Sequence, residues 1–151
     1  MSPSNELSRR KFMEKTAAGV AVPYLVSAGA LAQAPKTPPS EKIRVGLIGA
    51  GGMGRGNLAN CAKHDDVVVT AICDVWKERL DATGATYKDT AKGTSDYREL
   101  LARKDVDAVI IATPPHWHAL MAVEACRAGK DIYLQKPMTL HLAESRVVKN
   151  A

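Results

Sequence analysis

A glycine-rich hexad, Gly-Ala-Gly-Gly-Met-Gly at residues 49–54, constrains the fold of this 151-residue chain more than any other feature. The hexad follows a short β-branched run at residues 43–48, which predicts a buried strand. Residues 53–63 come next and have the pattern of a helix. A G-x-G-x-x-G sequence between a strand and a helix is typical of a turn that holds a pyrophosphate.

The three glycines of the motif have different tasks. Gly49 permits a tight turn, Gly51 lets the backbone approach a pyrophosphate without a Cβ in the way, and Gly54 lets the helix pack closely on the strand. The free N–H groups and the dipole of the helix, equivalent to roughly half a positive charge, then face the phosphates. The predicted cofactor-binding residues of this turn are Gly49, Ala50, Gly51, Gly52, Met53 and Gly54. A structural glycine turn without a ligand is the alternative.

Strand and helix patterns alternate along the rest of the chain. The predicted strands lie at residues 43–48, 67–73, 106–112 and 132–134, and the predicted helices at residues 53–63, 76–83, 96–103, 117–128 and from 142 onward. A polar stretch at residues 87–95 is expected to be a connection. Because the strands are apolar almost throughout, they favour a parallel sheet with both faces covered. The sequence therefore predicts an α/β domain with a doubly wound parallel sheet over residues 41–151.

An acid follows the second predicted strand. Asp74 lies 25 residues after Gly49, close to the usual offset of the carboxylate that binds the adenosine ribose. A 2′-phosphate about 5 Å from this carboxylate would be repelled by about 3 kcal/mol per unit charge at an effective dielectric of about 20. Asp74 therefore favours NAD over NADP, although Lys77 and Arg79 are close enough in sequence to weaken that preference.

Polar residues also follow the next two predicted strands. Ligands in an open α/β sheet bind outside the carboxyl ends of the strands. Thr113, Pro114 and His118 follow the third predicted strand, where a cofactor would lie. Gln135 and Lys136 follow the fourth, and an ammonium there can bond a substrate hydroxyl or orient a nicotinamide. A solvated surface lysine is an equally weighted interpretation of Lys136.

The histidines and cysteines give no sign of a metal or disulfide centre. His116 and His118 have no third carboxylate or cysteine ligand near them in sequence, so no metal is predicted. The three cysteines cannot all pair, and Cys73 is expected to be a core strand residue rather than a reactive thiol.

The first 34 residues are predicted to be an export signal and not part of the fold. Arg9 and Arg10 precede Phe12 and a mildly apolar stretch at residues 16–34 that ends in Ala-Gln-Ala, a small-x-small cleavage site. The arginine pair resembles a twin-arginine signal, which predicts use of the twin-arginine export machinery and a periplasmic location. An uncleaved membrane anchor and a coincidental arginine pair are the alternatives, but proline, glycine and serine dilute the stretch, so no stable membrane span is expected. Residues 35–40 are a proline-rich linker.

The charge pattern argues against a nucleic-acid partner. The formal net charge is +5, but part of that excess belongs to the first 34 residues. In the rest of the chain the basic and acidic residues are interspersed, and no basic run is interleaved with aromatic residues. We therefore expect no nucleic-acid binding.

The ordered set of motifs resembles the Gfo/Idh/MocA oxidoreductases. The set comprises GAGGMG, ICD at residues 72–74, DYRELL at 96–101, VDAVIIATPPHWH at 106–118 and QKP at 135–137. The resemblance implies an N-terminal Rossmann domain that binds NAD or NADP, and hydride transfer at a hydroxyl-bearing carbon of a sugar or cyclic polyol. It implies that Lys136 is catalytic and contacts substrate and nicotinamide, and that Thr113, Pro114 and His118 lie near the nicotinamide.

The resemblance also implies what the chain lacks. The C-terminal substrate domain of the family would lie beyond residue 151, so the chain is expected to be truncated, to bind dinucleotide weakly and to turn over little or no substrate. A homo-oligomer is expected at full length. Gln135 replaces the family's usual glutamate, and His141 stands where serine or threonine would complete a capping box with Glu144. A non-catalytic dinucleotide sensor of the same fold is the main alternative function, and a methyltransferase-type domain is a weaker one.

Overall fold

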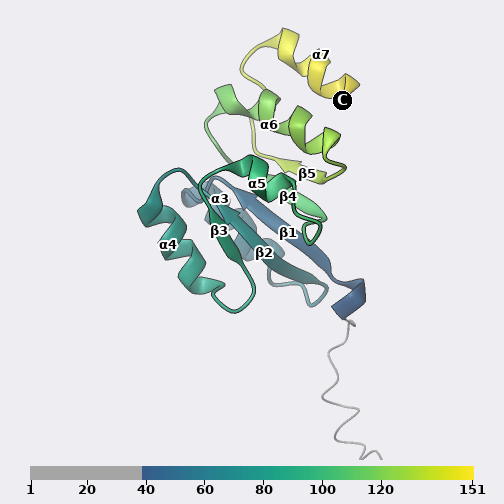
Figure 1. Cartoon of the computed structure of the whole chain (residues 1–151). Coiled ribbons are helices and arrows are strands. Elements are labelled where there is room, and N and C mark those ends of the chain that lie inside the picture. The colour runs from purple at the N-terminus through teal and green to yellow at the C-terminus, as the bar shows by residue number, and fades with distance from the viewer. Residues whose placement is uncertain (1–38) are drawn as a thin grey trace, which may run out of the picture. The chain divides into compact units, whose positions relative to one another are not determined.

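The computed structural model describes residues 39–151, so the predicted signal peptide at residues 1–34 and most of the predicted linker lie outside the described residues. The helical elements are η1 (Pro39–Glu41), α3 (Gly52–Cys61), α4 (Lys77–Thr86), α5 (Tyr97–Leu101), α6 (Pro115–Arg127) and α7 (Leu142–Asn150). The strands are β1 (Ile43–Ile48), β2 (Val67–Cys73), β3 (Lys92–Thr94), β4 (Ala108–Ile111) and β5 (Asp131–Leu134) (Figure 1).

The five strands form one parallel sheet in the order β3-β2-β1-β4-β5. The chain runs outward from β1 to β3 and then crosses back to place β4 on the other side of β1. The direction of winding therefore reverses between β1 and β4, which is the point where open α/β sheets bind their ligands. The prediction of a doubly wound parallel sheet is confirmed.

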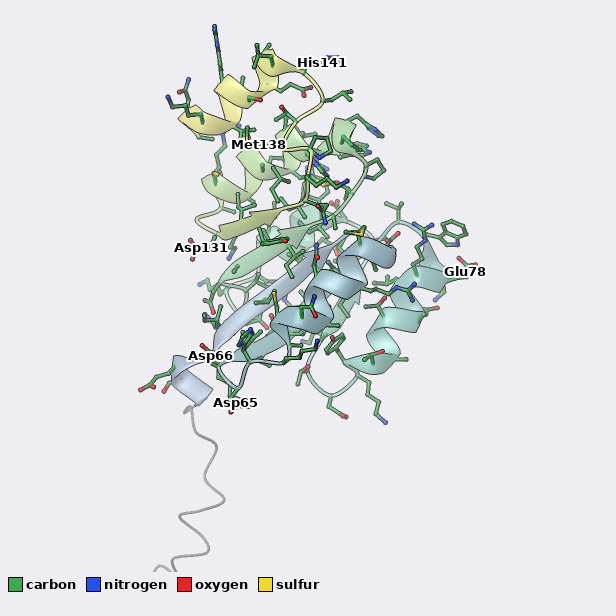
Figure 2. The ribbon with its side chains drawn as sticks, turned by 180° about the vertical axis from the view of Figure 1, so that it is seen from behind. Asp65, Asp66, Glu78, Asp131, Met138 and His141 are labelled. Atoms are coloured by element: carbon green, nitrogen blue, oxygen red, sulfur yellow. The ribbon has the colours of Figure 1, made fainter. Side chains whose placement is uncertain are left out.

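Helices cover both faces of this sheet. Helix α3 contacts β1 and β4, and α4 contacts β2 and β3; these two helices lie in front of the sheet in Figure 2. Helix α5 contacts β2 and β3, and α6 contacts β4 and β5, on the opposite face (Figure 1).

Strand side chains alternate between two buried clusters, one beneath each pair of helices. Leu47 of β1 packs with Leu58 of α3 in one cluster. Ile111 of β4 packs with Leu100 of α5 in the other. All four side chains are fully buried, which explains why the strands read as nearly continuous apolar runs.

One strand was not predicted. Residues 87–95 were expected to be a connection, but β3 pairs in parallel with Ala71, Ile72 and Cys73 of β2. Its sequence, Lys-Gly-Thr, has neither β-branched enrichment nor a run long enough to show a period, and two of its three residues are exposed. An edge strand of this length depends on its neighbour rather than on its own sequence.

Several predicted boundaries also shift. The third predicted strand, at residues 106–112, is limited to β4, and α6 begins at Pro115 rather than at residue 117 because proline fits the first turn of a helix.

The start of α7 is better specified than its sequence indicated. The Glu144 carboxylate accepts hydrogen bonds from the backbone amides of Leu140 and His141, both at 3.0 Å, without a serine or threonine cap.

Candidate functional site

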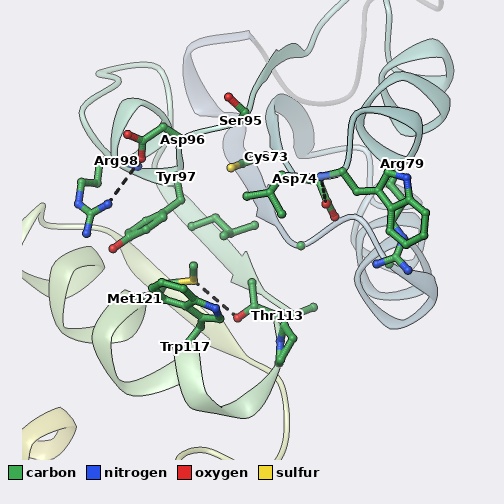
Figure 3. Close-up of a pocket in the computed structure, with 17 residues that line it drawn as sticks. Cys73, Asp74, Arg79, Ser95, Asp96, Tyr97, Arg98, Thr113, Trp117 and Met121 are labelled. Atoms are coloured by element: carbon green, nitrogen blue, oxygen red, sulfur yellow. Dashed lines mark hydrogen bonds and ion pairs between the residues drawn. The ribbon is translucent and has the colours of Figure 1, made fainter.

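A pocket of about 570 Å³ lies over the carboxyl ends of β1, β2 and β4. Gly49 and Gly51 of the first turn, Asp74 after β2, and Thr113 and Pro114 after β4 all line it. All five residues are predicted from the sequence to bind a cofactor. The structure brings them together at the point where the winding of the sheet reverses (Figure 3).

The glycine turn has the geometry that the motif predicts. Gly49 has a φ of 95°, and a Cβ there would lie 2.8 Å from the backbone of Ala112. A Cβ on Gly54 would lie 1.9 Å from the carbonyl oxygen of Gly49, so α3 packs against the turn only because residue 54 has no side chain. Gly51 faces the pocket, and its nearest neighbour is Arg79 Nη1, 3.7 Å from where a Cβ would be. The space beside Gly51 is therefore not filled by backbone.

The N-terminus of α3 follows directly. Its N-cap residue is Gly51, and within residues 39–151 no side chain makes a capping hydrogen bond to this end of the helix. The amides of the first helical turn have no intrahelical acceptors and carry the positive end of the helix dipole. Gly52 and Met53, which begin the helix, therefore present backbone donors at the turn, as the motif predicts for a pyrophosphate.

Asp74 joins the glycine turn to the end of β2. Its Oδ2 accepts a hydrogen bond from the Ala50 amide at 2.7 Å, and its Oδ1 accepts one from the Trp76 amide at 2.8 Å. The residue is only 8% exposed, yet it lines the pocket. A carboxylate oxygen has two lone pairs, so each oxygen keeps acceptor capacity for a ribose hydroxyl. The carboxylate is fixed in orientation and faces the first turn, as the ribose prediction requires.

Aromatic and sulfur-containing side chains form the apolar part of the pocket. Tyr97 at the start of α5 and Trp117 and Met121 of α6 line this side, away from Asp74 (Figure 3). Met121 Sδ lies 3.6 Å from Thr113 Oγ1, which donates to it. Burial raises the pKa of Tyr97 to about 12, with Glu124 adding to the shift, so the phenol is uncharged near neutral pH. This surface suits a flat apolar ring system.

Most residues of the apolar part of the pocket were not predicted from the sequence. None of Tyr97, Trp76, Trp117 and Met121 was assigned to the site from the sequence. The signal available in the sequence was the position of the two tryptophans, because each follows a predicted strand by a few residues. In the structure both are substantially exposed, at 53% and 42%.

Cys73 borders the pocket but has the properties of a core residue. It is 3% exposed at the end of β2. Burial, together with the neighbouring Asp74 carboxylate, raises the pKa of its thiol to about 12. The thiol therefore stays protonated, in agreement with the interpretation of Cys73 as a strand residue rather than a nucleophile.

His118 lies beneath the turn after β4 rather than in the pocket wall. It is 1% exposed, with Nδ1 2.7 Å from the Pro137 carbonyl oxygen and Nε2 2.8 Å from the Thr113 carbonyl oxygen. The ring thus connects the Thr113 turn to the segment that carries Lys136. The sequence predicts His118 beside the cofactor, but in the structure its ring contacts two backbone carbonyl oxygens and does not line the pocket.

Gln135 and Lys136 follow β5 at the same edge of the sheet. The Gln135 amide donates to the Ile111 carbonyl oxygen at 2.9 Å, which continues the pairing of β5 with β4. Gln135 Oε1 accepts from the Lys136 amide at 2.7 Å, so this side chain shapes the backbone at the lysine. Lys136 itself is exposed and is not among the residues that line the pocket.

The described residues form neither a metal centre nor a membrane-spanning helix. Within residues 39–151, no group of three or more His, Cys, Asp or Glu side chains is placed to hold a metal ion. No helix in the same residues combines the length and apolarity needed to cross a membrane.

Three features together define a dinucleotide-binding α/β domain. They are a parallel sheet whose direction of winding reverses at β1, a glycine turn at the first crossover, and a fixed carboxylate after β2. Comparison with protein families agrees. Residues 43–151 match the GFO_IDH_MocA family, described as "Oxidoreductase family, NAD-binding Rossmann fold". The chain belongs to the Gfo/Idh/MocA oxidoreductase family, of which this part is the NAD-binding Rossmann domain.

The chain is similar to proteins named as a glycosyl hydrolase, a dehydrogenase and a ketoreductase. A glycosyl hydrolase family 109 protein of Shewanella pealeana is 33% identical, over 92% of this chain and 35% of its own length. The WlbA dehydrogenase of Bordetella pertussis, solved with NADH and UDP-GlcNAcA, is 32% identical with a TM-score of 0.68, over 73% of this chain and 33% of that one. KijD10, a 3-ketoreductase of Actinomadura kijaniata solved with NADP and TDP-benzene, is 29% identical with a TM-score of 0.66. The match covers 72% of this chain and 33% of KijD10. The chain thus spans about a third of the length of these relatives.

Proposed function

We propose that the chain is the cofactor-binding domain of an enzyme that transfers a hydride between NAD(P) and a hydroxyl-bearing carbon of a sugar or cyclic polyol. The observation that carries the proposal is the Asp74 carboxylate, held by the Ala50 and Trp76 amides beside an open glycine turn. The family match and the nucleotide-bound dehydrogenase relatives support the same class of chemistry.

The residues present fit a nicotinamide dinucleotide. The backbone amides of Gly51 and of the first turn of α3 would hold the diphosphate, because those of Gly49 and Ala50 already donate to the Cys73 carbonyl oxygen and to Asp74. Asp74 would accept hydrogen bonds from the ribose. Tyr97, Trp117 and Met121 provide the apolar surface for a ring system. When bound, the nicotinamide supplies a hydride acceptor or donor.

Lys136 is the residue we assign to the reacting substrate. It follows β5, the strand next to β4, and its backbone is held by Gln135 and, through Pro137, by His118. From this position the ammonium would orient the substrate hydroxyl and hold a proton at its oxygen. We propose that the rest of the substrate site, and the homo-oligomer, require sequence that corresponds to the remainder of the relatives' length.

A second candidate is glycoside cleavage with the same cofactor. The glycosyl hydrolase family 109 names of the curated relatives favour it. The two activities differ in their redox balance. Sugar oxidation accumulates NADH, which is measured by its absorbance at about 340 nm, whereas hydrolysis cleaves the glycosidic bond with water and causes no net change in NAD. A non-catalytic sensor of the same fold would bind dinucleotide and do neither.

Replacing Asp74 by asparagine is expected to lower NAD affinity by roughly 10- to 100-fold, because hydrogen bonds to a charged carboxylate are worth about 1.5–3 kcal/mol. Isothermal titration calorimetry of the full chain measures the change. Asp81→Asn is the matched control, since Asp81 lies on the surface of α4 and pairs with Lys77. Equal affinity of D74N and the unmutated chain contradicts the ribose assignment, and no NAD binding by the unmutated chain contradicts the proposed function.

We further propose that the protein is exported to the periplasm by the twin-arginine machinery. The support is the sequence of residues 1–34, in which Arg9 and Arg10 precede the apolar stretch and the Ala-Gln-Ala site. Because this machinery carries folded proteins, the protein would take its dinucleotide with it from the cytoplasm.

Replacing both arginines by lysine (R9K/R10K) is expected to abolish export while conserving the charge, since the pathway requires the arginine pair. Cell fractionation and immunoblotting measure the periplasmic fraction. Lys15→Arg is the control and should be exported normally. Export of the double-lysine variant at the normal level contradicts the proposal, and an uncleaved chain in the membrane fraction favours an anchor instead.

A further inference from the structure

Arg79 of α4 is directed toward the glycine turn. Its Nη1 lies 3.7 Å from the position of a Cβ on Gly51, and both residues line the pocket. Asp74 lines the pocket on the same side, opposite Tyr97 and Arg98 (Figure 3). A guanidinium therefore lies beside the carboxylate that is assigned to the ribose.

Trp76 holds Arg79 in this position. The Arg79 guanidinium carbon lies 4.3 Å from the centre of the Trp76 ring, within the range of a cation–π contact. The amide of the same tryptophan donates to Asp74, so the residue that supports the cation is itself tied to the carboxylate. Within residues 39–151, Arg79 forms no ion pair with a carboxylate. Its charge is thus available to an anion in the pocket.

The neighbouring Lys77 has a different environment. Its Nζ lies 2.7 Å from Asp81 Oδ2 on the exposed surface of α4, and Lys77 does not line the pocket. Sequence alone left Lys77 and Arg79 as equivalent candidates for weakening the preference for NAD. The structure separates them, because only Arg79 lies near the ribose subsite.

We propose that Arg79 makes this subsite accept a 2′-phosphate, so that the protein binds NADP as well as NAD. The guanidinium offers paired N–H donors that match phosphate oxygens, and its charge opposes the repulsion between Asp74 and the phosphate. The charge of Asp74 is also partly compensated by its two amide donors. The inference rests on the proposed dinucleotide site and assigns the residue that sets its cofactor selectivity.

The test compares ligands that differ only in the 2′-phosphate. Calorimetric titration of the full chain with adenosine 2′,5′-bisphosphate and with adenosine 5′-monophosphate isolates the ribose subsite from Lys136 and the nicotinamide. NAD and NADP form a second pair. The expected result for the unmutated chain is an NADP dissociation constant within about tenfold of that for NAD, because the positive charge of Arg79 opposes the repulsion between Asp74 and the 2′-phosphate.

Arg79→Gln is expected to lower the ratio of NADP to NAD affinity by roughly 10- to 100-fold, as expected for loss of a charge-assisted hydrogen bond to phosphate. The ratio of the affinity for adenosine 2′,5′-bisphosphate to that for adenosine 5′-monophosphate should fall by the same factor. Arg79→Lys should retain part of the affinity for the 2′-phosphate. Lys77→Gln is the matched control, since it removes a cation from the same helix without touching the pocket, and both ratios should stay unchanged.

The possible failures are distinguishable. If the unmutated chain binds neither NAD nor NADP, the proposed function fails together with the inference. If it binds NAD but discriminates against NADP by far more than tenfold, only the inference is overturned. An R79Q variant that weakens both ligands of a pair equally also overturns it, because Arg79 would then contact a group that the two ligands share.

Discussion

Gly54→Ala is expected to abolish dinucleotide binding and to lower the free energy of unfolding by roughly 3 kcal/mol or more, as for a severe overpacking substitution. The added Cβ would lie 1.9 Å from the Gly49 carbonyl oxygen, which is backbone and has no rotamer through which to move away. The helix must therefore shift outward, and its first amides move with it. Urea unfolding followed by tryptophan fluorescence measures the stability, and calorimetric titration with NAD measures the binding.

Gly56→Ala is the matched control for this prediction. Gly56 lies two residues further along the same helix, and nothing lies within 4 Å of its Cβ position. Alanine there should stabilise the domain by about 0.5–1 kcal/mol, because glycine in a helix interior is unfavourable by that amount. A G54A chain with normal stability and NAD affinity would contradict the observed packing of α3 on the first turn.

His118→Ala is expected to lower the free energy of unfolding by roughly 2–4 kcal/mol, because a buried ring that lies between two backbone carbonyl oxygens is lost and a cavity forms. These oxygens belong to Thr113 and Pro137, at 2.8 and 2.7 Å from the ring. Loss of the ring also releases the Lys136 segment from α6. Hydrogen exchange should therefore show lower protection of the Gln135 amide, which otherwise donates to Ile111.

His116→Ala is the control, since His116 occupies the exposed side of the same helical turn. A His118→Gln variant keeps one donor and should recover part of the lost stability. Unchanged stability and unchanged protection of Gln135 in H118A would show that the two segments are held together by other contacts.

The sequence predicted the parts of this domain that depend on a repeating pattern or on a backbone requirement. The strands at residues 43–48 and 67–73 agree with β1 and β2, because buried parallel strands are marked by continuous apolar residues. The glycine turn was predictable because a φ of 95° and a 1.9 Å approach are requirements that glycine alone satisfies.

Features that depend on neighbours distant in sequence were not predictable. Strand β3 exists because β2 offers it an edge. His118 was assigned to the cofactor because it follows a strand end in the sequence, but its two ring nitrogens lie 2.7 and 2.8 Å from carbonyl oxygens of two different segments. The stacking of Arg79 on Trp76 likewise depends on side-chain direction, so sequence could not distinguish Arg79 from Lys77.

The two hydrogen bonds that the Asp74 carboxylate accepts from backbone amides limit how a descendant of this protein can change its preferred coenzyme. Removing the acid would relieve repulsion of an extra phosphate, but it would also leave the Ala50 and Trp76 amides without their acceptor and loosen the first turn. A cation introduced from α4 avoids that penalty. Selection for a new coenzyme should therefore act on the exposed helix beside the carboxylate while the carboxylate itself persists.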